Sequence, residues 1–330
     1  MMIQPVFREK RPEESSLTGT VMNNTKYNSL DYNRCVLIVM VILCHVVKLG
    51  ELYPDFQDAV LMIVNPAFLM ITGYLVRVDK GWKDFSLYLV RIILPYVIMT
   101  LGFGVLSVYL PVRYGLADCR LSTLLRALLV EPIGPYWYFH TMIICSFLYY
   151  IAFKLGRLGK LSSFFVFASL LIVCSRFLHL MSIRFAFSFF MGACIRQFCG
   201  SFHDFCRPSY YALIPFMLLL SKDPVTWSDF VVIILSFCFV SFFSQVFAGR
   251  EGWAMDVMGY IGRNTFPIYI FHPIFTMAAK FVSGWFVFDK SGVLYTVFTV
   301  VLCVSGSLGI ARLMDMTRLS RCFGRKRMLR

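Results

Sequence analysis

The segment Asp31–His45 reads DYNRCVLIVMVILCH, and ten apolar residues separate its arginine, Arg34, from its histidine, His45. Such an apolar run predicts a helix that crosses a membrane. An α-helix turns about 100° per residue, so eleven steps end about 20° beyond three full turns and leave both side chains on one face. We therefore expect Arg34 at the membrane surface and His45 about 16 Å deeper, near the middle of the bilayer.

His45 is expected at a depth where an ionisable side chain is costly and is by default a candidate functional group. A histidine that only hydrogen-bonds a neighbouring helix is the alternative. Asp31 lies three residues before Arg34 and shares its helix face. One face thus carries a carboxylate, a guanidinium and an imidazole, and the pairing of Arg34 with His45 favours a functional role.

The composition of this 330-residue chain indicates an all-α, polytopic membrane protein. Hydrophobic residues make up 58% of the chain and charged residues only 15%, whereas soluble domains are about a quarter charged. The first 30 residues are polar and contain no apolar core, so no cleaved signal peptide is expected. About ten transmembrane helices are predicted, at residues 33–49, 60–77, 88–110, 135–153, 161–178, 183–198, 210–221, 230–248, 264–284 and 293–312.

The distribution of Lys and Arg predicts the orientation, because both residues favour cytoplasmic loops. With the N-terminus inside, cytoplasmic segments hold more than twice as many of these residues as outer loops. Both termini are therefore expected in the cytoplasm, and the chain divides into a polar segment (1–30), a transmembrane domain (31–312) and a basic tail (313–330). The net charge of +14 fits this topology and contact with anionic lipid. Nucleic-acid binding is not expected, since no soluble domain accompanies the tail.

The eleven cysteines predict neither an outer-face disulfide nor a metal centre. Most lie in the predicted spans, where cysteine behaves as a small apolar residue, and Cys119 alone falls in an outer loop. Cys199, His203 and Cys206 cluster in an inner loop, but three ligands without a fourth are a weak zinc signal, so no metal is expected. The sequence also has no glycine-rich phosphate loop and no metalloprotease or triad motif.

Six motifs follow one another along the chain: the Arg34–His45 segment, PAFLMITGYL at 66–75, YLVRIILPY at 88–96, PYWYF at 135–139, FFMG at 189–192 and GRNTFPIYIFHP at 262–273. In this order they resemble the acyltransferase-3 family of integral membrane acyltransferases, from Asp31 to about residue 312. Within that family the chain looks most similar to stand-alone O-acetyltransferases of sugars and surface polysaccharides. Thr72 stands where serine is common before Gly-Tyr, and no soluble esterase domain follows the spans.

This resemblance implies an enzyme that uses acyl-coenzyme A, expected to be acetyl-coenzyme A, as a co-substrate and has no resident cofactor. Its acceptor would be a hydroxyl group of a cell-surface glycan or of a lipid-linked saccharide. The enzyme would be a multi-pass protein of the cytoplasmic (inner) membrane. Because the donor is cytoplasmic and the glycan is often at or beyond the outer face, the two substrates would have to meet within the membrane. Without an esterase domain, the chain would complete transfer alone or with a separate partner.

For that chemistry His45 and Arg34 are the expected catalytic residues. Imidazole can take a proton from a hydroxyl group or carry an acyl group, and a guanidinium suits a phosphate or a polarised carbonyl. Asp31 would hold Arg34 in a donor site, or it only caps the first helix. Arg91 would bind the donor or extend to lipid headgroups. Asn264 would cap the ninth span, whose N-terminus attracts anions.

The fourth and ninth spans supply the candidates for the acceptor side. Trp137, Tyr138 and His140 open the fourth span from outside and form either a sugar-stacking platform or an ordinary interfacial aromatic belt. Tyr269 and His272 form the Tyr-x-x-His end of the late motif. His272 would lie about 12 Å into its helix, as a second acid/base group or as a structural histidine beside a proline kink.

Two other functions also bring ionisable residues into a membrane. A transporter or flippase for a lipid-linked glycan often has two related halves, which this sequence lacks, and it leaves the pairing of Arg34 with His45 unexplained. A membrane scaffold would use these polar residues only to bind helices together. Thioester hydrolysis or release of coenzyme A would separate an acyltransferase from both alternatives.

Overall fold

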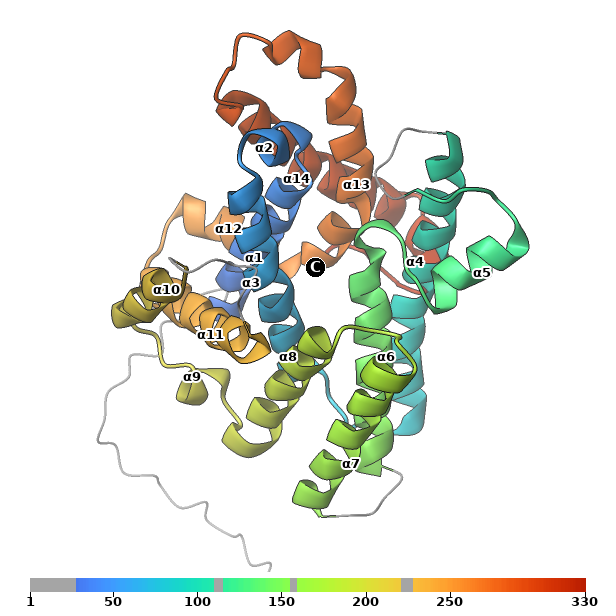
Figure 1. Cartoon of the computed structure of the whole chain (residues 1–330), viewed down its shortest axis with the longest axis vertical. Helices are drawn as coiled ribbons and strands as arrows, with labels where there is room; N and C mark the ends of the chain where they lie inside the picture. The colour runs from blue at the N-terminus through green and yellow to red at the C-terminus, as the bar shows by residue number, and fades with distance from the viewer. Residues whose placement is uncertain (1–27, 110–114, 155–158, 221–227) are drawn as a thin grey trace, which may run out of the picture.

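The computed structural model describes residues 28–109, 115–154, 159–220 and 228–330, and every regular element in these residues is helical (Figure 1). The prediction of a polar N-terminal segment falls mainly on residues that lie outside this description. Five described helices are long and apolar enough to cross a membrane, with bounds Pro54–Leu75, Trp82–Tyr109, Lys160–Phe177, Asp229–Val246 and Val293–Met316. The chain is therefore an all-helical, multi-pass membrane protein, as its sequence indicated.

The α-helices follow one another along the chain as α1 (Ser29–Cys44), α2 (Val47–Leu52), α3 (Pro54–Leu75), α4 (Trp82–Tyr109), α5 (Leu121–Leu129), α6 (Trp137–Lys154), α7 (Lys160–Ile172), α8 (Ile183–Cys194), α9 (Phe202–Phe205), α10 (Leu213–Leu220), α11 (Asp229–Val246), α12 (Trp253–Arg263), α13 (Thr265–Phe281) and α14 (Val293–Met316). Each of the ten predicted spans overlaps one of these helices. Short π-helical segments, Val173–Phe177 and Ile195–Cys199, extend α7 and α8. The sequence did not predict α2, α5, α9 and α12, because the first three are short and α12 carries a charged face.

The prediction of one continuous first span, residues 33–49, is wrong, because α1 ends at Cys44. The backbone of His45 has φ −102° and ψ 2°, and the chain turns there before α2 begins. No glycine or proline marks this break, so tertiary contacts cause it. The side-chain amide of Gln57 donates to the carbonyl oxygen of Cys44, which the helix end would otherwise leave unpaired. Val46, directly after the break, is buried against α13 and α14.

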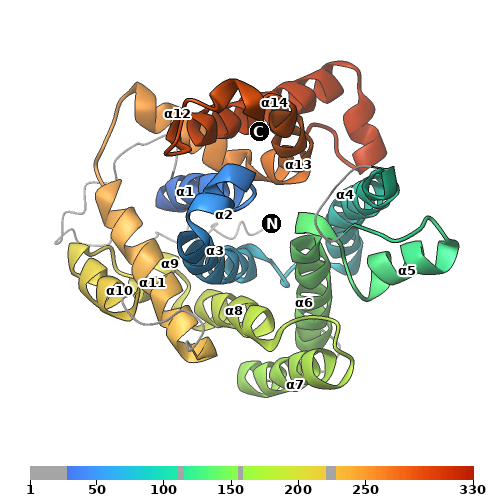
Figure 2. The same ribbon diagram turned by 45° about the horizontal axis from the view of Figure 1, so that its top comes forward.

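Helices α1 and α3 lie in the middle of the bundle, and the remaining long helices surround them (Figure 2). Helix α1 contacts α3, α11, α12, α13 and α14, whereas α3 also contacts α6 and α8. A residue on α1 therefore has protein on most sides. This position explains how polar groups of α1 can be kept away from lipid.

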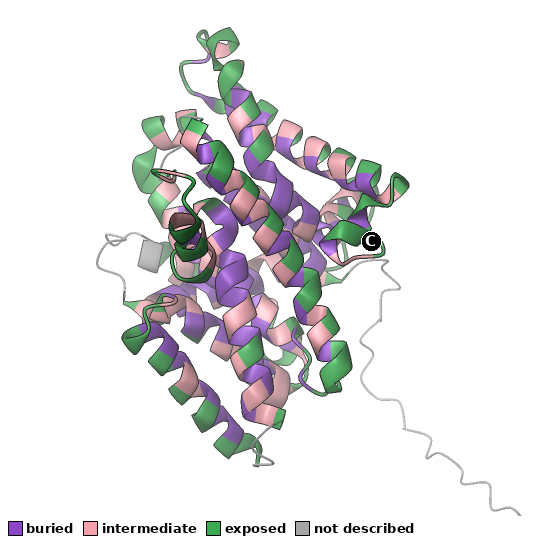
Figure 3. Cartoon of the chain, turned by 90° about the vertical axis from the view of Figure 1, so that its right-hand side faces the viewer, coloured by how far each residue is buried: buried purple, intermediate pink, exposed green. Residues whose placement is uncertain are grey.

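Many large apolar side chains are exposed on the outer surface of the bundle. Figure 3 shows buried residues along the interior faces of the helices and exposed ones along the outer faces. On α4 several exposed apolar residues recur at helical spacing, among them Leu87, Val90, Leu94, Ile98 and Val105. A stripe of this length in contact with water would be an aggregation hazard. Contact with lipid removes that penalty, so this face of α4 supports the membrane assignment.

Two glycines set the distance between α3 and α8. A Cβ atom on Gly192 would lie 1.9 Å from the carbonyl oxygen of Met70, and one on Gly73 would lie 2.1 Å from that of Phe189. Both neighbours are backbone atoms, which cannot rotate away as a flexible side chain can. Glycine at these two positions therefore lets the helices pack backbone to backbone, as small residues do in membrane bundles.

We expect Gly192→Ala to lower the thermal midpoint of the detergent-solubilised protein, because the two helices must separate. Overpacking of this kind costs about 1–3 kcal/mol. Gly309→Ala in α14 is the matched control, since a Cβ there meets no atom within 4 Å. Alanine should leave that midpoint unchanged or raise it slightly, because alanine is the better helix former. Equal midpoints for the two variants would contradict the close packing of α3 on α8.

We expect the basic tail to be cytoplasmic, and two exposed cysteines allow a direct test. Cys119 precedes α5 and Cys322 lies in the tail, and both thiols are exposed. A membrane-impermeant maleimide should label Cys119 in intact spheroplasts but label Cys322 only after the membrane is permeabilised. Cys119→Ser and Cys322→Ser variants assign each label to its residue. Labelling of Cys322 in intact spheroplasts would reverse the topology.

Candidate functional site

A cavity of about 360 Å³ opens where α1, α3, α4, α6 and α13 meet the C-terminal segment. Phe68, Ile71, Ile92 and Met142 are among its apolar lining residues. Its polar lining residues come from all five helices or their flanks and from the tail, and they are Arg34, Thr72, Tyr88, Tyr138, Arg263, Thr265, Tyr269, Arg325 and Arg330. We call this cavity the arginine pocket.

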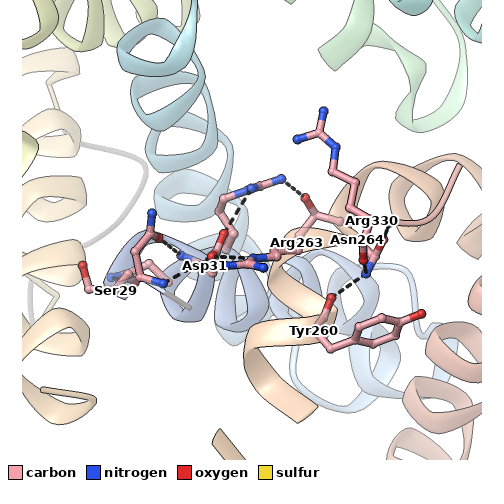
Figure 4. A network of polar contacts seen from close by, with 10 residues as sticks. Ser29, Asp31, Tyr260, Arg263, Asn264 and Arg330 are labelled. Carbon is pink, nitrogen blue, oxygen red and sulfur yellow. Dashed lines mark hydrogen bonds and ion pairs between the residues drawn. The ribbon is translucent and has the colours of Figure 1, made fainter. Parts of the chain in front are cut away.

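Arg34 is held in the arginine pocket by groups from two helices. Its Nη2 donates to Thr265 Oγ1 at 2.6 Å, and its Nη1 lies 3.7 Å from a carboxylate oxygen of Asp31. Nε of Arg263 donates to the other carboxylate oxygen of Asp31 at 3.2 Å (Figure 4). One carboxylate thus sits between two guanidinium groups, and its side chain is only 10% exposed.

Asp31 both takes part in the cap of α1 and pairs with Arg34. Asn28 is the N-cap residue of α1, and its side chain accepts from the backbone N–H of Asp31 at 2.9 Å. The carboxylate of Asp31 in turn accepts from the backbone N–H of Asn28 at 3.3 Å, which completes a capping box. The same carboxylate also pairs with the arginines, so capping of the helix and positioning of Arg34 depend on one side chain.

Gly262 allows α12 to approach the start of α1. A Cβ atom at this position would lie 1.7 Å from the carbonyl oxygen of Asp31. The glycine of the GRNTFPIYIFHP motif therefore has a steric function, and it brings the next residue, Arg263, within reach of Asp31.

The predicted aromatic residues of the fourth span face different surroundings. Tyr138 lines the arginine pocket, and its hydroxyl lies 2.6 Å from Thr72 Oγ1. Trp137 stacks on Phe185, with ring centroids 4.5 Å apart. Nε2 of His140 lies 3.0 Å from the carbonyl oxygen of Leu129. Tyr138 therefore joins Arg34, and the three residues do not form a single outer platform.

Tyr269 closes the arginine pocket next to Tyr138, and their ring centroids are 5.0 Å apart. Its hydroxyl donates to the carbonyl oxygen of Pro135 at 2.7 Å. Its ring also meets the imidazole of His272 at a centroid distance of 5.7 Å. Tyr269 is therefore in contact with both the pocket and this histidine.

His272 and His45 are brought together although they are far apart in the sequence. Their ring centroids are 5.2 Å apart, and the ring of His272 is fully buried whereas His45 is exposed. Nδ1 of His272 lies 2.8 Å from the carbonyl oxygen of Tyr269. A carbonyl oxygen only accepts, so we assign the proton of neutral His272 to Nδ1. Its Nε2 then carries a lone pair, and this atom has no hydrogen-bond partner among the described residues.

Two predicted donor-binding residues contribute in other ways than expected. The side chain of Arg91 is exposed and does not line the arginine pocket, but its carbonyl oxygen accepts from Nε of Arg325 at 3.2 Å. Asn264 occupies the N-cap position of α13 without making the expected side-chain cap. Its side chain bonds the backbone of Tyr260 and of Arg330 instead.

A comparison with protein families covers the helices that surround Arg34 and His45. A family model described as an acyltransferase domain matches residues 27–312. The chain belongs to the acyltransferase-3 family. It is thus an enzyme that transfers acyl groups. No curated protein and no solved structure matches this acyltransferase.

Three arginines of the pocket were not predicted from the acyltransferase sequence. Arg263 is the second residue of the GRNTFPIYIFHP motif, but nothing in the sequence links it to Asp31. Arg325 and Arg330 lie beyond the family match, in a tail whose charge was attributed to topology. The signal that could have found them is the presence of two apolar residues, Met328 and Leu329, among the basic residues of the last six positions, because a tail that docks on protein needs both kinds.

The structure describes only in part the three residues of the weak zinc signal, which are Cys199, His203 and Cys206. The side chain of His203 lies outside the described residues. Sγ of Cys206 is buried and donates to the carbonyl oxygen of Phe237 at 3.3 Å. This contact gives Cys206 a packing role between the loop and α11.

We expect Arg34→Ala to lower kcat/KM of transfer about 10- to 100-fold, because charge-assisted hydrogen bonds of this kind contribute about 1.5–3 kcal/mol. Arg34→Lys should restore little activity, since a single ammonium group cannot reproduce a planar fork that meets both Thr265 and Asp31. Arg77→Ala, at an exposed arginine after α3, is the control. Initial rates at equal protein level in membranes are the measurement. Wild-type rates for Arg34→Lys would instead indicate that Arg34 only anchors the helix.

Proposed function

We propose that this acyltransferase moves an acyl group, specifically acetyl, from acetyl-coenzyme A to a hydroxyl group of a cell-surface glycan or its lipid-linked precursor. It would act in the cytoplasmic (inner) membrane. One observation carries the proposal: Tyr269 lines the arginine pocket and contacts His272, whose ring in turn contacts the exposed imidazole of His45. This series of contacts links a pocket suited to the donor with an imidazole that is open to the acceptor.

The arginine pocket suits an anionic donor with a long apolar arm. Guanidinium groups bind phosphate oxygens in pairs of parallel hydrogen bonds. Coenzyme A carries its phosphates at one end and its thioester at the end of the slender pantetheine arm. With the phosphates at the basic side of this pocket, the arm would lie along the apolar lining beside Tyr138 and Tyr269, and the ring of Tyr269 contacts His272.

The histidine pair suits the acceptor. The hydroxyl oxygen would attack the thioester carbonyl carbon, so that a C–O bond forms and the C–S bond breaks. His45 would accept the hydroxyl proton and return it to the leaving thiolate of coenzyme A. Nε2 of His272, which has no partner among the described residues, would position His45 or the acceptor through a hydrogen bond. Atoms and charge balance without a metal or a redox partner.

The test is an assay of both products with the purified enzyme in lipid nanodiscs. Labelled acetyl-coenzyme A and a glycan extract from the source membrane are supplied, and free coenzyme A and labelled glycan are quantified by chromatography. A thiol dye is unsuitable, because the chain itself has exposed cysteines. We expect release of coenzyme A to rise with added glycan and to match its labelling. Glycan movement across the membrane without any release of coenzyme A would support the transporter alternative instead.

We expect His45→Ala to lower transfer about 100- to 10,000-fold, which is the range for removal of a general base. His179→Asn is the matched control. His179 is an exposed histidine with φ 53°, and asparagine tolerates this left-handed backbone conformation. Product formation is followed at equal membrane protein levels for both variants. Normal glycan acylation with His45→Ala would remove His45 from the mechanism.

A further inference from the structure

The segment after α14 folds back onto the arginine pocket, although it lies beyond the residues that match the family. Its fold depends on Asp315 at the end of α14. One carboxylate oxygen accepts from Ser320 Oγ at 2.5 Å and from the backbone N–H of Met328 at 2.6 Å, and the other accepts from the N–H of Leu329 at 3.0 Å. The side chain of Met328 is 2% exposed, and that of Phe323 is also buried. These contacts give the tail a defined position on the protein.

The last residue of this segment is joined to the base of α13. The backbone N–H of Arg330 donates to Oδ1 of Asn264 at 2.8 Å, and Nδ2 of Asn264 donates to the carbonyl oxygen of Arg330 at 3.3 Å (Figure 4). One amide side chain therefore pairs with both backbone groups of the tail. This double contact holds Arg330 at the rim of the arginine pocket, where its side chain stays exposed.

Arg325 is held in the same pocket by groups that leave its charge uncompensated. Its Nε donates to the carbonyl oxygen of Arg91, and its guanidinium carbon lies 3.5 Å from the ring centroid of Phe266. Burial, followed by the neighbouring charges of Arg330 and Arg91, lowers the pKa of Arg325 to about 10. The group is still protonated at neutral pH, so the pocket keeps this positive charge.

The charges around the pocket do not balance. Asp31 pairs with Arg34 and Arg263. Within the described part of the chain, no Asp or Glu carboxylate lies within ion-pair distance of Arg325 or Arg330. Like charges collected in a partly buried cavity destabilise the unliganded state and attract an anion. The two tail arginines are therefore available to a ligand in a way that the two helix arginines are not.

We propose that the tail segment, residues 319–330, forms one wall of the arginine pocket and that Arg325 and Arg330 bind the phosphate groups of coenzyme A. This inference rests on the proposed function, because it assumes the same donor. Arg34 and Arg263, restrained by Asp31, shape the inner part of the pocket, while the tail supplies the charge for the nucleotide end. Donor binding would thus depend partly on residues that lie beyond the family match.

The experiment measures binding of coenzyme A itself, so its result does not depend on which acyl group is transferred. Purified protein in a zwitterionic detergent is titrated calorimetrically with coenzyme A and with pantetheine, which lacks the phosphates. We expect Arg325→Ala and Arg330→Ala each to raise the Kd for coenzyme A about tenfold, the effect of one lost charge-assisted contact. The Kd for pantetheine should not change. Arg325→Lys should recover part of the affinity, because it keeps the charge without the fork.

Lys326→Ala is the matched control, since Lys326 is an exposed cation of the same segment that does not line the pocket. If the Arg325 variants bind coenzyme A as Lys326→Ala does, the tail inference fails and the proposed donor stands. If the wild-type protein does not bind coenzyme A, the proposed donor fails and the tail inference fails with it. Tighter binding by Arg325→Ala would identify the segment as a plug and overturn its role as a wall.

Discussion

The carboxylate of Asp31 is the contact on which the rest of the site depends. It completes the N-terminal cap of α1, and it lies between the guanidinium groups of Arg34 and Arg263. Removal of one partner from such a partly buried group costs about 3–5 kcal/mol, because the remaining charges lose their compensation. The interaction is possible only because Gly262 lets α12 touch the backbone of α1. Local capping, helix packing and the geometry of the pocket are thus coupled through one side chain.

The break after Cys44 has an equally direct effect on the chemistry. A helix that continued through His45 would direct the imidazole along the same side as Arg34 and surround it with neighbouring helices. Because α1 ends there, His45 is exposed while its ring still contacts the buried ring of His272. The two histidines therefore differ in environment: one is open to an approaching substrate, and the other is fixed by the carbonyl oxygen of Tyr269. Such a difference suits a pair in which one group reacts and the other positions it.

The helices and the tail each supply two of the four arginines that line the arginine pocket. The helix arginines Arg34 and Arg263 are paired with a carboxylate and so have fixed positions, whereas Arg325 of the tail rests on a carbonyl oxygen and an aromatic ring. A guanidinium on an aromatic face keeps its outward N–H groups for another acceptor. The fold thereby combines a rigid inner part of the pocket with a charged outer part.

The sequence by itself determined the all-helical membrane architecture and the approximate positions of the helices, and it predicted Arg34, His45 and Asp31 as candidate site residues. Apolar runs of sufficient length and the cost of a charge in lipid are local properties, so they can be read from consecutive residues. The glycines of the motifs were visible too, although their steric role was not. Tertiary structure alone decided that α1 breaks at His45, that Tyr138 belongs to the arginine pocket and that Trp137 does not, and that Arg263, Arg325 and Arg330 join Arg34. The physical reason is that these features depend on contacts between residues up to hundreds of positions apart, such as Gln57 with a helix end and Asn264 with the tail, and no local spacing records such contacts.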